Sequence, residues 1–466
     1  MTAVPTISGR ERWLFGVGAV ATGVINNGLA YFMLFYYNQV LGLPGSYAGT
    51  AILISMIFDS ISDPAIGVWS DRMQSRWGRR HPFMYVSAFP VMILYGLIWY
   101  PPELSDFGLF IYLAAVTTAL RFFSTLFEIP SMSLLVELTD DYDERTRLAG
   151  LRIMLGWVGG LAMAFLMWGY FMATWGEQNA LTFQLSGLLG ACVAFFAIVV
   201  SSIGLHGRIP YLKTPPKREA WKMSQFVSEL RVTLSNRNFL ALFIAAIFAA
   251  IAGGIKTNFE SFVMLHFWEF SPEQVQWIFA GLIISSILAA YLAPKVTRRF
   301  DKRGGAIRVY ALSIIFAALP YILRLTGYFP ENDSAYLYPI MMVHQILDVT
   351  IIVMSLIILS SMLADVVEDS ETRTGRREEG LFFSAQTFAA KVSTGFGVLF
   401  AGVTLDLINF PEAAVPGEVA AEIVWKLGFV FGPAMMFFFC LALGAISFYG
   451  ITREQHNERL QALRAD

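Results

Sequence analysis

Long apolar runs separated by short polar connections dominate the chain. A helix needs about 20 residues to cross the hydrocarbon layer of a bilayer. The first half contains six apolar runs of at least that order, near residues 13–40, 47–69, 83–100, 107–137, 147–174 and 181–206. The second half contains six more, near 238–268, 274–296, 306–327, 336–364, 380–406 and 423–450. The pattern predicts an all-α membrane protein with twelve transmembrane helices.

The polar connections alternate in charge along the chain. Lys and Arg gather in every second connection, as in 72–80, 208–222 and 295–303. The connections between them contain Asp and Glu but neither Lys nor Arg. Because positively charged loops stay on the cytoplasmic side, we expect both termini in the cytoplasm and a multi-pass protein of the plasma membrane, the inner membrane of a bacterium.

The two halves of the chain repeat each other. The basic segment 67–80 after the second run is answered by 295–304 after the eighth, and the segment 137–147 after the fourth, whose acids are followed by Arg145 and Arg147, by 365–376 after the tenth. A repeat offset of six spans preserves orientation. We therefore predict two pseudo-symmetric six-helix bundles (1–206 and 238–450), a cytoplasmic linker with an interfacial helix (207–237) and a cytoplasmic tail (451–466).

The composition is that of a protein that lies mainly in lipid, and it also restricts the classes of molecule that the protein could bind. The chain is 56% hydrophobic and 15% charged, with a mean hydropathy of +0.58 and a net charge of −2. Such a charge favours no nucleic acid, and the two cysteines lie inside apolar runs, which indicates neither a disulfide nor a zinc site. We expect a monomer in the bilayer that binds a small molecule and needs no cofactor beyond a coupling cation.

Charged residues inside the second apolar run carry the main functional prediction, because intramembrane charge is costly and its default interpretation is functional. Asp59 and Asp63 lie one helical turn apart on the same face. Two neighbouring carboxylates repel unless a proton, Na⁺ or Li⁺ lies between them. Pro64 cannot donate to the Ser60 carbonyl, which leaves a further oxygen near the pair. The alternative is a buried acid pair neutralised by a basic neighbour.

Polar residues of other runs reach a similar depth. At a rise of about 1.5 Å per residue, our boundaries put Asp63, Glu128, Arg152 and Lys391 at the same level, so they are predicted to converge. Lys391 would then be the counter-ion of the empty cation site, although snorkelling to an interface is the alternative.

Several further polar residues are candidates with two open interpretations. Asn26 and Asn27 either line the substrate cavity or cap a helix contact. The pairs Lys256/Glu260 and His344/Asp348, each spaced i,i+4, are either intrahelical pairs or part of a cavity. The residues after the second run are candidates for gating, because an acid at a helix end can hold a basic loop in one of two carrier states; they are Gly67, Asp71, Arg72, Arg76, Gly78 and Arg79.

With these motifs the chain resembles the glycoside–pentoside–hexuronide:cation symporters of the major facilitator superfamily, a family that includes the bacterial melibiose permease. The matching motifs are Asp59-Ser-Ile-Ser62-Asp63-Pro64-Ala-Ile-Gly67, Asp71-Arg-x-x-x-Arg76-x-Gly78, Glu128-Ile-Pro130, Asp141-Tyr-x-Glu-Arg145-Thr-Arg147, and Arg373-Thr-Gly-Arg376 leading to Gln386-Thr-x-x-x-Lys391. The resemblance implies that Asp59, Ser62, Asp63 and Thr125 bind the cation and that Glu128, Arg152 and Lys391 face the substrate, with Asn26 as a further candidate ligand.

The chain departs from the melibiose permease at two substrate positions. Gly23 stands where that permease has a sugar-binding acid, and Met132 stands where it has a stacking tryptophan. We therefore expect a cation-coupled symporter of a glycoside or other sugar, with a carrier of an amphiphile such as a lysophospholipid as the alternative. An intramembrane prenyltransferase is a remote third possibility, because Asp-x-x-x-Asp can chelate magnesium diphosphate.

Overall fold

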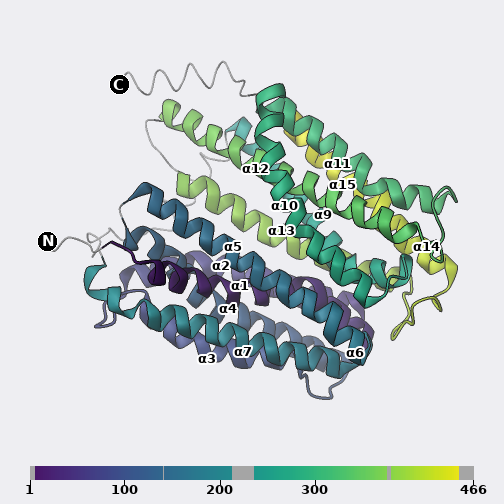
Figure 1. Ribbon diagram of the computed structural model, residues 1–466, viewed down its shortest axis with the longest axis horizontal. Coiled ribbons are helices and arrows are strands. Elements are labelled where there is room, and N and C mark those ends of the chain that lie inside the picture. Colours follow the sequence, from purple (N-terminus) through teal and green to yellow (C-terminus); the bar gives the residue numbers. More distant parts are fainter. Residues whose placement is uncertain (1–5, 140, 213–235, 375–378, 451–466) are drawn as a thin grey trace. The chain divides into compact units, whose positions relative to one another are not determined.

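The computed structural model describes residues 6–139, 141–212, 236–374 and 379–450, and every regular element within these ranges is helical (Figure 1). Within them, 12 helices are long and apolar enough to cross a membrane. The predicted number of spans and the all-α class are therefore confirmed. Most of the predicted linker, 213–235, and the predicted tail, 451–466, lie outside the described residues.

Each span of the first half coincides with one apolar run of the sequence to within a few residues. The elements are α1 (Gly9–Phe35) with a π-helical turn (Tyr36–Val40), α2 (Gly45–Arg72), α3 (His81–Trp99), α4 (Asp106–Leu138), α5 (Tyr142–Leu166) continued by a π-helical turn (Met167–Met172) and α6 (Ala173–Trp175), and α7 (Ala180–Gly204). A short 3₁₀-helix (His206–Tyr211) follows them.

The spans of the second half follow the same rule, except that the tenth span, α12, continues to Thr374, beyond the end of its apolar run near 364. They are α9 (Arg237–Phe262) with a π-helical turn (Val263–Phe267), α10 (Pro272–Phe300), α11 (Lys302–Leu325), α12 (Leu337–Thr374), α13 (Glu379–Leu407), and α14 (Ala421–Phe429) continued by a π-helical turn (Val430–Ala434) and α15 (Met435–Ser447). The helices agree with the apolar runs because a segment in lipid has to form its backbone hydrogen bonds within itself, so each apolar run becomes a helix.

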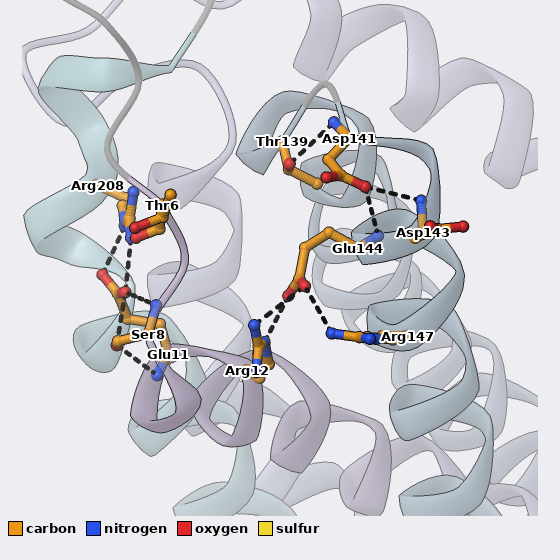
Figure 2. Close-up of polar contacts among 10 residues, drawn as sticks. All are labelled: Thr6, Ser8, Glu11, Arg12, Thr139, Asp141, Asp143, Glu144, Arg147 and Arg208. Carbon is orange, nitrogen blue, oxygen red and sulfur yellow. Dashed lines mark hydrogen bonds and ion pairs between the residues drawn. The ribbon is translucent and has the colours of Figure 1, made fainter.

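Polar residues at the start of α1 connect it to the ends of two other elements (Figure 2). Ser8 and Glu11 form a capping box, which satisfies the first free N–H groups of the helix. Glu11 also binds Arg208 through two contacts of 2.5 and 2.6 Å, and this hydrogen-bonded carboxylate raises the pKa of the Arg208 guanidinium. Arg12 binds Glu144 in the first turn of α5, with Nε 2.5 Å from Oε1.

The chain divides into two compact units. Unit 1 comprises Met1–Arg218, Ser271–Gln276 and Val398–Ala414, and unit 2 comprises Glu219–Phe270, Trp277–Gly397 and Val415–Asp466. Within unit 1, α1 packs against α5 and α7, α3 against α4 and α7, and α2 against α4. Within unit 2, α9 packs against α12 and α15, and α11 against α12 and α15.

Glycines bring the first and fifth spans of each half into close contact. A Cβ atom on Gly23 of α1 would lie 1.9 Å from the carbonyl oxygen of Gly156 on α5. A Cβ atom on Gly254 of α9 would lie 2.4 Å from the carbonyl oxygen of Thr394 on α13. In both helices an asparagine four residues later donates to the glycine carbonyl, at 3.0 Å in one and 2.9 Å in the other. Small residues at the closest approach are typical of membrane helix packing, and the repeated contact supports the internal repeat of the sequence.

The last part of α13, from Val398 onward, belongs to unit 1 and is hydrogen-bonded to the start of α2. The two oxygens of Asp406 accept from the backbone N–H groups of Gly45 and Ser46, at 2.7 and 2.8 Å. The first N–H groups of a helix have no partner within the helix, so a carboxylate from a distant part of the chain acts as the cap of α2. A Cβ atom on Gly402 would lie 2.0 Å from the Gly45 carbonyl oxygen, which shows how closely the two segments approach.

Candidate cation and substrate site

Three side-chain oxygens from α2 and α4 meet inside unit 1. The hydroxyl oxygen of Thr125 lies 3.0 Å from Oδ1 of Asp59 and 2.9 Å from Oδ1 of Asp63. Asp59 and Thr125 are buried, at 4% and 3% exposed. A threonine hydroxyl has one proton to donate, so it can donate to only one carboxylate at a time. The arrangement brings together three of the four residues expected to bind the cation.

Ser62, the fourth expected ligand, is buried but directed locally. Its hydroxyl donates to the backbone carbonyl of Asp59, with the two oxygens 3.1 Å apart. Pro64 lies inside α2, which continues to Arg72, and the Ser60 hydroxyl donates to the Met56 carbonyl at 2.8 Å. Both serine hydroxyls therefore donate hydrogen bonds to backbone carbonyls of their own helix.

Arg121 of α4 lies beside the carboxylate pair and was missed as a site residue. Its Nη1 is 3.9 Å from Oδ2 of Asp59 and donates to Oδ1 of Asn26 on α1 at 3.3 Å. Asn26 is thus connected to the pair through one guanidinium, whereas Asn27 donates to the Gly23 carbonyl. Arg121 is therefore the basic neighbour required by the alternative interpretation, in which a buried acid pair is neutralised by a basic residue. A charged residue one turn before Thr125 in an apolar run was the signal that could have identified it.

Glu128 and Arg152 lie on the neighbouring part of unit 1. Arg152 of α5 donates through Nη2 to the hydroxyl of Ser131 at 2.8 Å, and its guanidinium carbon is 5.5 Å from the centre of the Phe15 ring. Glu128 is close enough for its charge to act on Arg152. The buried Nη1 of Arg152 has no hydrogen-bond partner among the described residues, which leaves a donor for a ligand.

The two positions that differ from the melibiose permease have distinct surroundings. At Gly23 the carbonyl of Gly156 occupies the space of any side chain, so an acid could not stand there without moving α1 from α5. Met132 is 58% exposed. Lys391, the predicted counter-ion, lies on α13 within unit 2, so its convergence with Asp63 stays a prediction.

The gating candidates form an ion-pair cluster with two additional residues. Asp71 contacts the guanidinium groups of Arg79 and Arg80. Both arginines also bind Oε1 of Glu137 at the end of α4, at 2.6 and 2.9 Å. Arg80 and Glu137 were not among the predicted gating residues, although both lie in the segments that the sequence repeats.

The other gating candidates are placed differently. Arg72 and Arg76 are exposed, and the Arg76 guanidinium lies 5.1 Å from the centre of the Trp77 ring. Gly78 has φ +71°, and a Cβ atom there would lie 3.3 Å from Ile209, so its turn requires glycine. A Cβ atom on Gly67 would have an ordinary 3.7 Å contact with Ile129.

Unit 2 contains the counterpart of this cluster. Lys302, at the start of α11, binds Asp365 of α12 with 2.5 Å between Nζ and Oδ1. The sequence repeat pairs Glu137 with Asp365 and the segment of Arg79 with that of Lys302, so equivalent helix ends form equivalent ion pairs.

Of the two interpretations of the i,i+4 pairs in unit 2, the structure favours the cavity, since Lys256, His344 and Asp348 line one cavity and their polar partners lie on neighbouring helices. Lys256 of α9 binds Asp348 of α12, and Gln345 of α12 donates to Oε1 of Glu260 at 2.9 Å. The contacts run between helices because α9 and α12 pack together, which the spacing along one helix could not reveal.

Comparisons with known proteins identify the family to which the chain belongs. Residues 14–453 match the model of the family described as MFS/sugar transport protein. The inner membrane symporter YicJ of Escherichia coli K12 is 26% identical over 96% of this chain and 93% of its own. The isoprimeverose transporter of Lactiplantibacillus pentosus is 23% identical over 95% of this chain and 89% of its own.

A solved structure shares the fold. The nucleoside transporter NupG superposes with a TM-score of 0.64 at 13% identity, over 96% of this chain and 100% of its own. At that identity the likeness concerns the fold alone.

Proposed function

The chain belongs to the family of MFS/sugar transport proteins, and on this basis we propose that it is a cation-coupled symporter of a sugar or a similar polar organic molecule. Membership makes the chain a secondary transporter of the inner membrane, with multiple spans. Family membership also favours a transporter over the intramembrane prenyltransferase that the Asp-x-x-x-Asp pattern had left as a remote possibility. The cation and the substrate class are the proposed part.

The observation that carries the proposal is the meeting of Asp59, Asp63 and Thr125. Carboxylate and hydroxyl oxygens are the ligands that hard cations such as Na⁺ prefer, and a proton shared by two carboxylates would equally remove their repulsion. All three oxygens belong to membrane-spanning helices of unit 1. Intramembrane carboxylates so placed mark ion pathways.

Arg121 supplies a mechanism for exchange at this site. The guanidinium lies on one side of Asp59 and is also hydrogen-bonded to Asn26. A cation and Arg121 attract the same carboxylate, so cation binding would release Arg121 toward α1. In this way occupation of the cation site is transmitted to Asn26, one of the proposed substrate ligands.

Glu128, Arg152 and Asn26 are the proposed substrate ligands within unit 1. A carboxylate and a guanidinium with a free donor suit the hydroxyl groups of a sugar, which both donate and accept hydrogen bonds. The names of the family and of the isoprimeverose transporter support a glycoside. The exposed Met132 and the closed position at Gly23 favour an amphiphile as the second candidate.

Uptake into proteoliposomes tests the proposal. A panel of radiolabelled sugars and lysophospholipids is offered with and without an inward Na⁺ or proton gradient. We expect the gradient to drive accumulation of a sugar, and Asp59→Asn or Asp63→Asn to reduce that accumulation by at least about tenfold, equivalent to ~1.4 kcal/mol.

Asp333→Asn is the matched control, because it removes an exposed carboxylate from a connection outside the helices. It should leave accumulation unchanged. Gradient-dependent accumulation that persists in both helix variants would contradict the cation site, and accumulation of lysophospholipid alone would replace the sugar by an amphiphile.

A further inference from the structure

A second group of ionisable side chains is enclosed within unit 2. Lys256 and Asp348 form an ion pair between α9 and α12, and Glu260 accepts a hydrogen bond from Gln345. Asp348 is 1% exposed. Lys256, His344, Gln345 and Asp348 line one cavity together with Tyr321 and an apolar wall formed by residues such as Phe439.

The orientation of His344 follows from its contact with Phe316 on α11. The two rings are stacked, with centroids 4.9 Å apart and planes 11° apart. Nε2 of His344 lies 2.9 Å from the backbone carbonyl oxygen of Phe316. A carbonyl oxygen only accepts, so Nε2 carries a hydrogen, and Nδ1 is a base when the ring is neutral.

Two buried acceptors of this cavity are without partners. Neither Nδ1 of His344 nor Oδ1 of Asp348 has a hydrogen bond within the described part of the chain. The two residues are one turn apart on α12, and both line the cavity. Leaving a buried acceptor unpaired is costly, and a single added proton would supply the donor that both lack.

Other ionisable groups surround His344 in this cluster. Lys256 and Asp348 form an ion pair that is neutral as a whole, and Glu260 of α9, hydrogen-bonded to Gln345, is a further acid that can hold a proton. Tyr321 of α11 adds a neutral hydroxyl, and α15 contributes apolar side chains such as Met435. α13, which packs on α9 at Gly254, carries Lys391 one turn before that contact. A proton on His344 would therefore lie one helical turn from the carboxylate of Asp348, within hydrogen-bonding reach directly or through one water.

We propose that this cavity is a proton-binding site, in which Nδ1 of His344 takes a proton from solvent and Oδ1 of Asp348 accepts the new N–H, directly or through one water. The positive ring then lies against the face of Phe316, a favourable position for a cation. The site lies in unit 2, whereas Asp59 and Asp63 lie in unit 1. The proposed proton equilibrium therefore concerns residues other than the carboxylate pair.

Nitrogen-15 NMR of the purified, lipid-reconstituted full chain tests this inference without any substrate. The chain has five histidines, and His344→Gln assigns the signal of this one. With falling pH we expect His344 to change from a neutral ring protonated at Nε2 to a doubly protonated ring. A ring that stays neutral at every pH at which the protein remains folded would overturn the proposal.

Asp348→Asn separates the proton site from a merely structural histidine, and it keeps the labelled residue in place. Without the carboxylate the imidazolium loses its acceptor, so the midpoint of the His344 titration should move by about one pH unit or more to lower pH. Asp59→Asn is the control in unit 1 and should leave the midpoint unchanged. An unchanged midpoint in Asp348→Asn contradicts the pairing, whereas loss of uptake in Asp59→Asn with a normal His344 titration concerns only the cation site.

Discussion

Thr125 lies within hydrogen-bond distance of both Asp59 and Asp63 through one hydroxyl group. It lies on α4, whereas both acids lie on α2. The hydroxyl can donate to one carboxylate while its lone pairs remain available to a cation. Residues that contribute neutral oxygen atoms in this way adjust the affinity of a cation site without changing its charge.

Thr125→Val tests this role, because it removes the hydroxyl while nearly keeping the shape of the side chain. We expect the concentration of the coupling cation, Na⁺ or H⁺, for half-maximal uptake to rise by about tenfold, which corresponds to ~1.4 kcal/mol, while counterflow of substrate at saturating cation is retained. Ser133→Ala is the control on the same helix, since its hydroxyl donates to the backbone carbonyl of Ile129. Equal dependence on the coupling cation in the wild type and in Thr125→Val would exclude Thr125 as a ligand.

Close helix contacts at glycine are the corresponding feature at the scale of elements. α1 meets α5 at Gly23, and α9 meets α13 at Gly254, with an asparagine one turn later in each case. Each glycine lets two backbones approach closely where any side chain would separate them. The same contact in both halves indicates that the pairs α1–α5 and α9–α13 are equivalent members of the repeat.

Gly254→Ala and Gly253→Ala form a matched pair of variants for this contact. The added Cβ of the first would lie 2.4 Å from the Thr394 carbonyl oxygen, whereas the second has no atom within 4 Å. Overpacking of this kind costs roughly 1–3 kcal/mol. Thermal unfolding in detergent should therefore show a lower Tm for Gly254→Ala but not for Gly253→Ala. Equal melting of the two variants would show that α9 and α13 can separate at little cost.

At the scale of the whole molecule, the order of spans and the charges of their connections determine the topology. The helices follow the apolar runs along the described chain. The basic connections, including 73–80 between α2 and α3, alternate with acidic ones, including 326–336 between α11 and α12. The positive-inside rule therefore predicts that both termini face the cytoplasm.

Cysteine labelling in intact cells tests this topology, after replacement of the natural cysteines Cys192 and Cys440. Gln74→Cys and Ala335→Cys introduce single thiols at exposed positions of a basic and an acidic connection. A membrane-impermeant maleimide should label Ala335→Cys in intact cells and Gln74→Cys only after permeabilisation. The reverse pattern would invert the predicted orientation.

The amino-acid sequence was sufficient to predict the spans and to single out the carboxylate pair. Hydrophobic length has to match the bilayer, and carboxylates within a span are rare enough to be noticed singly, so Asp59 and Asp63 could be selected before any contact was known, whereas Thr125 was implied only by the family resemblance.

The partners of the charged residues depend on how the helices pack in three dimensions. Arg121 beside Asp59, Glu137 beside Arg79, and Lys256 paired with Asp348 are contacts between helices. Spacing along one helix says which side chains share a face but not which neighbouring helix that face meets. For the same reason only the tertiary structure shows that Nδ1 of His344 and Oδ1 of Asp348 have no hydrogen-bond partner among the described residues.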